Sequence, residues 1–129
     1  MNDRTVRTRW TGGMRAVTDA DGFEIIVDEP EAYGGAGTDP QPTDLLLASV
    51  ASCLALSVAF VARRRGVHLP NLNVSVVGTY QGLEFERIAA SISSNTPGEV
   101  LRTLVSEAER ICYVSNTLRH QPELVVHVG

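Results

Sequence analysis

Three short runs near the N-terminus combine hydrophobic positions with polar ones in the way typical of β-strands. They cover residues 4–12, 14–18 and 23–28, and they are separated by a Gly-Gly pair and by the turn sequence "DADG". Turns of this kind join antiparallel strands. The pattern therefore predicts a meander of three strands, followed by a loop rich in proline and glycine over residues 29–42.

The most hydrophobic stretch covers residues 45–62 without a charge and is followed directly by "RRR". We predict a helix from near Thr43 to about Arg65, because Pro42 or Thr43 can open its first turn and Gly66 can end it. The stretch is long enough for a membrane span. Serines interrupt it, however, and no second span follows, so a buried helix of a soluble protein is the better interpretation and we expect no membrane partner.

Period-two alternation appears in residues 72–82 and 83–94, which predicts a second hairpin. The sequence "TPGE" then predicts a helix start with Thr96 as the N-cap and Glu99 completing a capping box. Apolar positions at helical spacing follow up to Cys112. Residues 113–120 continue as a kinked or second short helix, and residues 123–128, "ELVVHV", are expected to form a closing strand.

This order of elements, β-β-β-α-β-β-α-(α)-β, is typical of an α+β fold. No repeat or linker interrupts it, so residues 1–129 are expected to form one domain. The helix over residues 43–65 is hydrophobic on nearly all sides, and two small sheets of one chain can hardly cover it. We therefore expect a homodimer.

Composition and charge make some functions of this protein improbable. The net charge is −4, and the 11 basic residues, all arginine, are spread along the chain, which makes nucleic acid an improbable partner. The N-terminus has no apolar segment typical of a signal peptide, so we expect the reducing cytoplasm, where a stable structural disulfide is improbable. Two cysteines in such a protein are most often unrelated buried thiols.

Cys53 lies in the middle of the hydrophobic helix, and its position allows two interpretations. Ser49 and Ser57 lie four residues before and after it, and Ser52 is adjacent, so a thiol sits in a stripe of small polar residues. In the first interpretation the serines bond back to the helix backbone and the cysteine fills the core. In the second, the stripe is a shallow pocket that water can reach and that holds a thiolate, which Cys112 of the next helix could meet.

Two segments resemble the OsmC/Ohr family. They are "TDPQPTDLLLASVASCLALSVAFVARRRGVHLPNLNVSVVG", which contains the first cysteine, and "AERICYVSNTL", which contains the second. The resemblance implies an intertwined α+β homodimer with antiparallel sheets wrapped around long central helices. It also implies a hydroperoxide reductase, a thiol peroxidase of oxidative or osmotic stress defence that acts mainly on organic hydroperoxides. Cys53 matches the peroxide-reacting cysteine and Cys112 the resolving one.

The family also uses an N-terminal arginine to hold the thiolate, and Arg15 is the best match, with Arg7 and Arg9 as rivals. Asp44 stands where many members have glutamate. It lies nine residues before Cys53, about 13 Å along a helix, so it can act only through an arginine or from an irregular first turn. Alternatively, Asp44 is a favourable charge at a helix N-terminus. Many members also have proline after the second cysteine, where this chain has Tyr113.

The chemistry implied by the resemblance needs a cation near Cys53, because the thiolate and not the thiol is the nucleophile. The three arginines that end the helix lie about 15 Å or farther along it, so the charge is expected from the N-terminal strands or from a partner chain. An external dithiol must complete the cycle, and no metal, flavin or nicotinamide cofactor is required. The expected apolar walls of the pocket are Leu45, Leu46, Leu56 and Phe60.

Two other functions compete with the peroxidase. One is a non-catalytic dimeric stress or ligand-binding protein on the same fold, with inert cysteines. The other is a zinc site made by the two cysteines and a histidine, but no cysteine–histidine pair has the spacing that zinc ligands show. The histidines are His68, His120 and His127.

Overall fold

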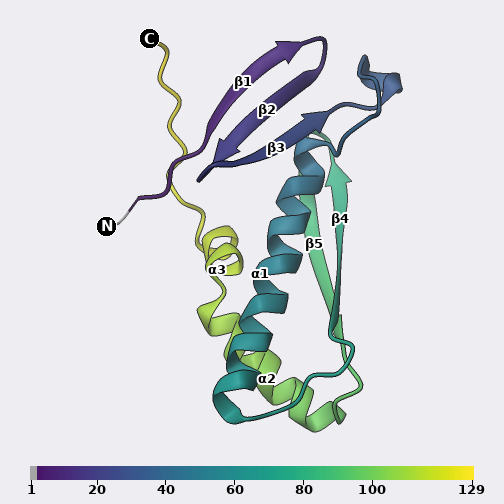
Figure 1. Ribbon diagram of the computed structural model, residues 1–129, viewed down its shortest axis with the longest axis vertical. Coiled ribbons are helices and arrows are strands. Elements are labelled where there is room, and N and C mark those ends of the chain that lie inside the picture. Colours follow the sequence, from purple (N-terminus) through teal and green to yellow (C-terminus); the bar gives the residue numbers. More distant parts are fainter. Residues whose placement is uncertain (1–2) are drawn as a thin grey trace. The chain divides into compact units, whose positions relative to one another are not determined.

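The structure, a computed structural model, describes residues 3–129 and has the predicted α+β fold. The chain divides into two compact units, one up to Leu46 and the other from Leu47 to the C-terminus, and Figure 1 labels the elements of both. Each unit is described by itself below.

The first unit contains the predicted meander. Strands β1 (Arg7–Gly12), β2 (Arg15–Ala20) and β3 (Phe23–Asp28) form one antiparallel sheet in the order β1-β2-β3. The turn between β2 and β3 contains Asp21 and Gly22, both with positive φ. Aspartate and glycine tolerate that conformation, which explains why "DADG" reverses the chain there.

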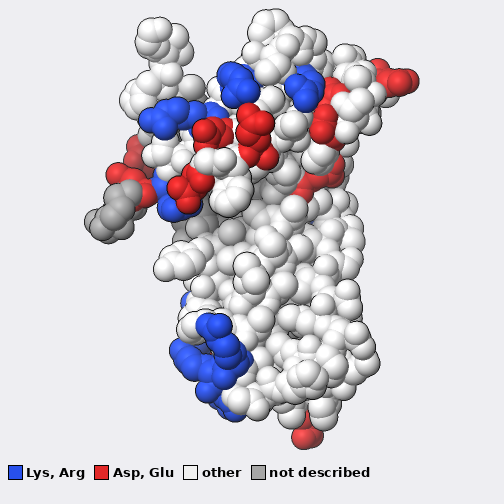
Figure 2. Space-filling model, in the orientation of Figure 1, with Lys and Arg blue, Asp and Glu red and all other residues white. Residues whose placement is uncertain are grey.

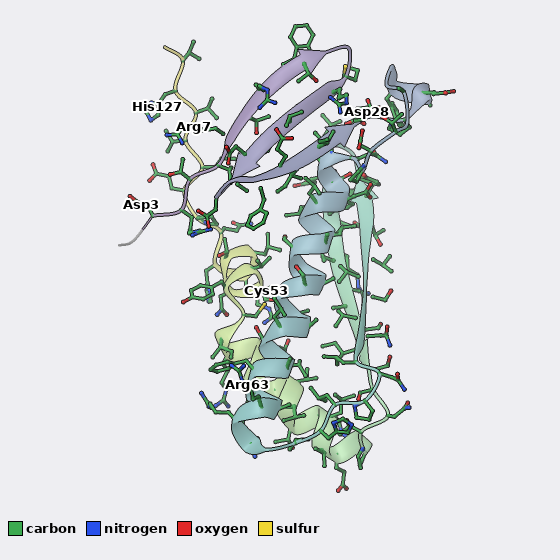
Figure 3. The ribbon with its side chains drawn as sticks, in the orientation of Figure 1. Asp3, Arg7, Asp28, Cys53, Arg63 and His127 are labelled. Atoms are coloured by element: carbon green, nitrogen blue, oxygen red, sulfur yellow. The ribbon has the colours of Figure 1, made fainter. Side chains whose placement is uncertain are left out.

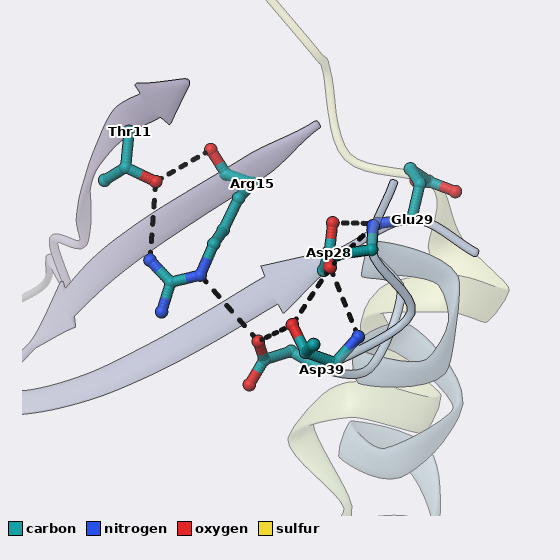
Figure 4. Close-up of polar contacts among 7 residues, drawn as sticks. Thr11, Arg15, Asp28, Glu29 and Asp39 are labelled. Atoms are coloured by element: carbon teal, nitrogen blue, oxygen red, sulfur yellow. Dashed lines mark hydrogen bonds and ion pairs between the residues drawn. The ribbon is translucent and has the colours of Figure 1, made fainter. Parts of the chain in front are cut away.

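The loop after β3 is fixed by the carboxylate of Asp28, which is only 2% exposed. It accepts hydrogen bonds from the backbone N–H groups of Glu29 (2.9 Å), Ala36 (3.1 Å) and Thr38 (3.2 Å), and from the Thr38 hydroxyl (3.0 Å), as Figure 4 shows in part. The N–H of Thr38 is the main cause that lowers the pKa of this carboxyl, and it outweighs burial, which acts in the opposite direction. The loop, including the short 3₁₀ helix η1 (Glu31–Tyr33), is therefore tied to the end of β3.

Helix α1 (Pro42–Arg65) has the predicted bounds and begins in the first unit. It ends at Gly66, whose φ of 68° is left-handed, and the N–H of Val67 bonds to the carbonyl of Ala62 at 2.8 Å. Within residues 3–129 it is the one helix long and apolar enough, by length and composition alone, to cross a membrane; 33% of its most apolar window is buried.

The second unit contains the predicted second hairpin, β4 (Asn73–Gln81) and β5 (Glu84–Ser93). Its inner face packs against α1 through valine and isoleucine side chains of both strands. At Gly78 on this face, a Cβ would lie 2.7 Å from the ring of Phe85, so a larger residue would displace that ring. That ring stacks on Tyr80 with centroids 4.5 Å apart.

Helices α2 (Gly98–Ile111) and α3 (Tyr113–His120) follow the hairpin. Leu104 and Ala108 of α2 pack against the C-terminal half of α1 and complete a buried cluster. The predicted capping role of Thr96 is wrong: α2 begins after Pro97 with no side-chain cap. The buried Thr96 hydroxyl instead donates to the carbonyl of His68 at 3.2 Å, a partner 28 residues away.

The predicted C-terminal strand is also wrong. Residues 121–129 have no strand assignment, and four of their hydrophobic side chains are exposed: Leu124, Val125, Val126 and Val128. A strand exists only when a second strand pairs with it, and none of the described strands pairs with this segment. Hydrophobic composition alone was therefore not sufficient to identify a strand here.

Candidate functional site

The structure brings the two cysteines together. Cys53 lies in the middle of α1, where Figure 3 labels it, and Cys112 occupies the break between α2 and α3. Both are free thiols that share an apolar cluster with Val50 and Leu54. Cys53 is partly exposed, whereas Cys112 is fully buried. The two thiols therefore touch, but only one of them is reachable from solvent.

Cys112 has an environment that favours its thiolate. Burial, the largest single influence, raises the pKa of the Cys112 thiol, but hydrogen bonds together lower it below its ordinary value. The Ser115 hydroxyl donates to Sγ at 3.1 Å, and the backbone of Ser115, the Cys53 thiol and the backbone of Val114 act in the same direction. Cys112 also directly precedes the N-terminus of α3, where a helix dipole favours negative charge.

Cys53 opens onto a cavity of about 630 Å³ in the second unit. Its lining is mainly apolar and comes from α1, the end of α2 and the start of α3: Cys53, Leu56, Ser57, Phe60, Arg110, Ile111, Tyr113 and Asn116. Leu56 and Phe60 are walls as predicted, whereas Leu45 and Leu46 belong to the first unit. A small hydrophobic molecule could reach the Cys53 sulfur through this cavity.

The serine stripe around Cys53 serves both of the roles considered for it. The hydroxyl of Ser52 bonds back to the helix, to the carbonyl of Ala48 at 2.8 Å. Ser57 lines the cavity beside Cys53. Ser52 therefore bonds to its own helix, as in the first interpretation, whereas Ser57 lines a pocket, as in the second.

Arg110 is a lining residue that sequence reasoning missed. It lies in the last turn of α2, two residues before Cys112, and is the one charged residue in the cavity wall. The expectation that a cation must come from the N-terminal strands or a partner chain is therefore incomplete. The overlooked signal was its sequence position, two residues before the second cysteine at the end of the same helix.

Arg15 and Asp44 belong to the first unit, and each has a partner there. The guanidinium of Arg15 lies 3.8 Å from the carboxylate of Asp39 and donates to the Thr11 hydroxyl at 3.5 Å (Figure 4). The carboxylate of Asp44 accepts the N–H of Gln41 at 3.0 Å, at the start of α1. The favourable helix-start role considered for Asp44 is thus present in the structure.

The rival arginines of β1 have more exposed positions. Arg9 pairs with Glu24 of β3 at 3.4 Å, with more than half of each side chain exposed. Arg7, labelled in Figure 3, is also exposed. Exposed pairs of this kind contribute little to stability.

The described residues contain no group of three or more His, Cys, Asp or Glu side chains that could hold a metal ion. Of the three histidines, His120 bonds through Nδ1 to the carbonyl of Asn116 at 2.9 Å, within its own helix.

The fold and the site define an α+β protein with two free, adjacent cysteines at an apolar cavity. The sequence model of the family described as OsmC-like protein matches residues 35–127, which include both cysteines. The chain therefore belongs to the OsmC-like protein family. A comparison with curated proteins gives no match.

Solved structures of other proteins have a similar fold. An OsmC-like protein from Mycoplasma pneumoniae is 17% identical, with a TM-score of 0.77 over 94% of this chain and 91% of that one. An organic hydroperoxide resistance protein from Elizabethkingia anophelis is 22% identical, with a TM-score of 0.68 over 94% and 91%. The organic hydroperoxide resistance protein OsmC from Legionella pneumophila is 17% identical, with a TM-score of 0.68 over 92% and 90%.

Proposed function

We propose that this protein is a thiol peroxidase that reduces organic hydroperoxides, with Cys53 as the reacting thiol and Cys112 as the resolving thiol. One observation carries the proposal: a partly exposed thiol in the wall of an apolar cavity hydrogen-bonds to a fully buried thiol of the same cluster. The family and the names of two structural neighbours, both organic hydroperoxide resistance proteins, agree with it.

The first step is attack by the Cys53 thiolate on the outer oxygen of the hydroperoxide. A sulfur–oxygen bond forms, the O–O bond breaks, and the leaving alkoxide takes a proton to become an alcohol. Cys53 is thereby oxidised to a sulfenic acid. The apolar walls formed by Leu56, Phe60 and Ile111 would bind the alkyl part of the substrate and exclude water.

The second step is condensation of the two cysteines. The Cys112 thiolate attacks the sulfenic sulfur, a disulfide forms, and the hydroxyl group leaves as water after taking a proton. The lowered pKa of Cys112 suits this role, because it raises the fraction of reactive thiolate near neutral pH. Burial of Cys112 also directs it toward its neighbour, because peroxide in solvent cannot reach it.

The third step returns the protein to its reduced form with an external dithiol. A thiolate of the dithiol attacks the accessible sulfur of Cys53, and Cys112 leaves as a thiolate. A thiol of lower pKa is the better leaving group, so the same hydrogen bonds that favour step two also favour this step. The second thiol of the reductant then displaces Cys53 and leaves as part of a disulfide.

Three further features complete the proposal. Arg15 would hold the Cys53 thiolate and the leaving oxygen, with Asp39 orienting the guanidinium through their 3.8 Å pair. Asp44 would support the start of α1. In a cytoplasmic homodimer the partner would pack beside the exposed stripe of α1, where Leu56 is 72% and Phe60 42% exposed, and would close the open side of the cavity that they line.

The test is mass spectrometry of the protein after one equivalent of cumene hydroperoxide. We expect one equivalent of cumyl alcohol and a Cys53–Cys112 disulfide within one chain. In Cys112→Ser, dimedone should trap a sulfenic acid on Cys53. If the wild-type protein yields only a stable sulfinic acid on Cys53, then Cys112 is not the resolving thiol. If no alcohol forms, the peroxidase proposal fails.

A further inference from the structure

The ion pair of Arg15 with Asp39 differs from the ordinary surface pairs of the first unit. Figure 2 shows acidic and basic side chains interspersed over the strands of this unit. Arg9 and Glu24 form a pair of the ordinary kind, with 64% and 62% of their side chains exposed. In the pair of Arg15 with Asp39 the exposed fractions are 42% and 25%. An acid that is so enclosed can direct a guanidinium group, provided that the loop carrying the acid is itself fixed.

The loop that carries Asp39 is fixed on both sides of this residue by Asp28. Thr38, which precedes Asp39, donates its N–H and its hydroxyl to Oδ2 of Asp28, at 3.2 Å and 3.0 Å. Pro40, which follows Asp39, accepts the N–H of Asp28 on its carbonyl at 3.1 Å. Because Asp28 is only 2% exposed, Asp39 cannot shift its backbone without breaking a buried hydrogen bond.

The hydroxyl of Thr38 connects the two carboxylates. Its oxygen lies 3.0 Å from Oδ2 of Asp28 and 2.9 Å from Oδ2 of Asp39. A hydroxyl has one proton to donate, and Oδ2 of Asp28 already accepts two backbone N–H groups, so this proton is available to Asp39. Two carboxylates at one hydroxyl repel each other unless each has its own positive partner. Asp28 has the backbone N–H groups, and Asp39 has Arg15.

The register of the sheet brings Arg15 to this place. Arg15 of β2 lies directly opposite Asp28 of β3, and opposite residues of an antiparallel pair project from the same face. The carboxylate of Asp28 is occupied by donors of the loop. The guanidinium of Arg15 therefore lies between Asp39, at 3.8 Å, and the hydroxyl of Thr11, at 3.5 Å (Figure 4).

We propose that Thr38 is a positioning residue: fixed by the buried carboxylate of Asp28, it holds Asp39 and, through Asp39, the guanidinium of Arg15 in one orientation. This inference rests on the proposed role of Arg15 as the cation that holds the Cys53 thiolate. Such a cation needs a direction as well as a charge, because a displacement of about 1 Å at a reaction site can slow the reaction about a hundredfold.

The first experiment removes only the hydroxyl of Thr38. Thr38→Val keeps the backbone bonds to Asp28, whereas Asp28→Asn would place an NH2 donor against N–H groups and disturb the whole loop. Thr38→Val should slow the oxidation of Cys53 by cumene hydroperoxide about tenfold and move the rise of this rate with pH to higher pH. Thr38→Ser, which keeps the hydroxyl, should restore both. The matched control is Thr8→Val, which breaks the 2.6 Å contact with Thr18 on the same sheet and should change neither.

Arg15→Met decides whether the effect of Thr38 passes through Arg15. If it does, adding Thr38→Val to Arg15→Met will slow the oxidation of Cys53 no further, because the group that it would misplace is already absent. If the two substitutions slow the reaction independently, the hydroxyl acts elsewhere and the inference is overturned. A wild-type rate of oxidation in Thr38→Val alone would also overturn it.

A spectroscopic measurement separates this inference from the peroxidase proposal. The NMR signal of the Arg15 Nε–H group is identified by its loss in Arg15→Met. This proton should exchange with solvent about tenfold faster in Thr38→Val than in the wild-type protein, and Thr38→Ser should restore the slow exchange. If no hydroperoxide is consumed but this difference in exchange is seen, the peroxidase proposal fails and Thr38 still holds Arg15. Equal exchange in the wild-type protein and Thr38→Val would contradict the role of Thr38.

Discussion

The surroundings of the two cysteines differ although the thiols touch. Cys53 lies in an unbroken stretch of helix, partly exposed, in the wall of a cavity. Cys112 is fully buried at a break between two helices, with the hydroxyl of Ser115 donating to its sulfur. Access and thiolate stabilisation are thus given to different sulfur atoms. This difference suits the resolving role proposed for Cys112, which must attack the sulfenic sulfur and later leave, whereas the Cys53 thiolate that attacks the peroxide needs a separate cation.

The largest effect is expected from Cys53→Ser. It removes the accessible sulfur, and the buried Cys112 cannot replace it, so kcat/KM for cumene hydroperoxide should fall by more than about a thousandfold. Peroxide consumption in the presence of dithiothreitol measures it. Substantial turnover by this variant would show that the accessible thiol is not the reacting one.

The second-largest effect on catalytic turnover is expected from Cys112→Ser. One equivalent of hydroperoxide should still be consumed at the wild-type rate, but no intramolecular disulfide can follow. Excess peroxide should then drive Cys53 to the sulfinic acid, because nothing resolves the sulfenic acid. Single-turnover kinetics and intact-mass measurements separate the two stages. A slow first stage would mean that Cys112 also assists the attack on peroxide.

Ser115→Ala tests the stabilisation of the Cys112 thiolate. Removing the hydroxyl should raise the pKa of Cys112, because one of the hydrogen bonds that lowers it is lost. Disulfide formation requires the thiolate, so its rate rises as pH rises through that pKa, and in the variant this rise should move to higher pH. We expect disulfide formation to slow several-fold at neutral pH, with the first-stage rate unchanged. An unshifted pH profile would exclude the hydroxyl as a cause.

The smallest effect is expected from the matched variant Ser52→Ala. This serine is adjacent to Cys53, but its hydroxyl bonds to the carbonyl of Ala48 and not to a sulfur. Turnover and its pH dependence should stay unchanged, and the free energy of unfolding should change by less than about 0.5 kcal/mol in a urea titration. If Ser52→Ala shifted the pH dependence of turnover as much as Ser115→Ala does, a serine hydroxyl would affect both thiols, and the proposed difference between Cys53 and Cys112 would be wrong.

Local patterns in the sequence predicted most of the elements. The N-terminal strands and the end of α1 follow from turn sequences and from glycines with positive φ, and the second hairpin follows from period-two alternation, all of which involve only near neighbours. The contact of Cys53 with Cys112 was expected from the family resemblance. Local patterns alone left open whether the cysteines were unrelated core residues.

The features that were missed depend on residues far apart in the chain. Thr96 does not cap α2 because His68 offers its hydroxyl another partner. Glu107 forms its ion pair with Arg65, 42 residues before it, which local sequence patterns do not show. The lowered pKa of Cys112 depends in part on a hydrogen bond from Cys53, which lies on another helix 59 residues earlier.

The loop that Asp28 holds has a consequence for which amino-acid changes the protein can tolerate. A Cβ at Gly35 would lie 1.7 Å from the carbonyl oxygen of Glu29, a backbone atom that cannot rotate away. A Cβ at Gly82, by contrast, would meet nothing within 4 Å, although its φ of 60° adds backbone strain. In a library of random variants selected for folding, every other residue should therefore be depleted at position 35, whereas asparagine and aspartate, which accept a left-handed backbone, should persist at position 82.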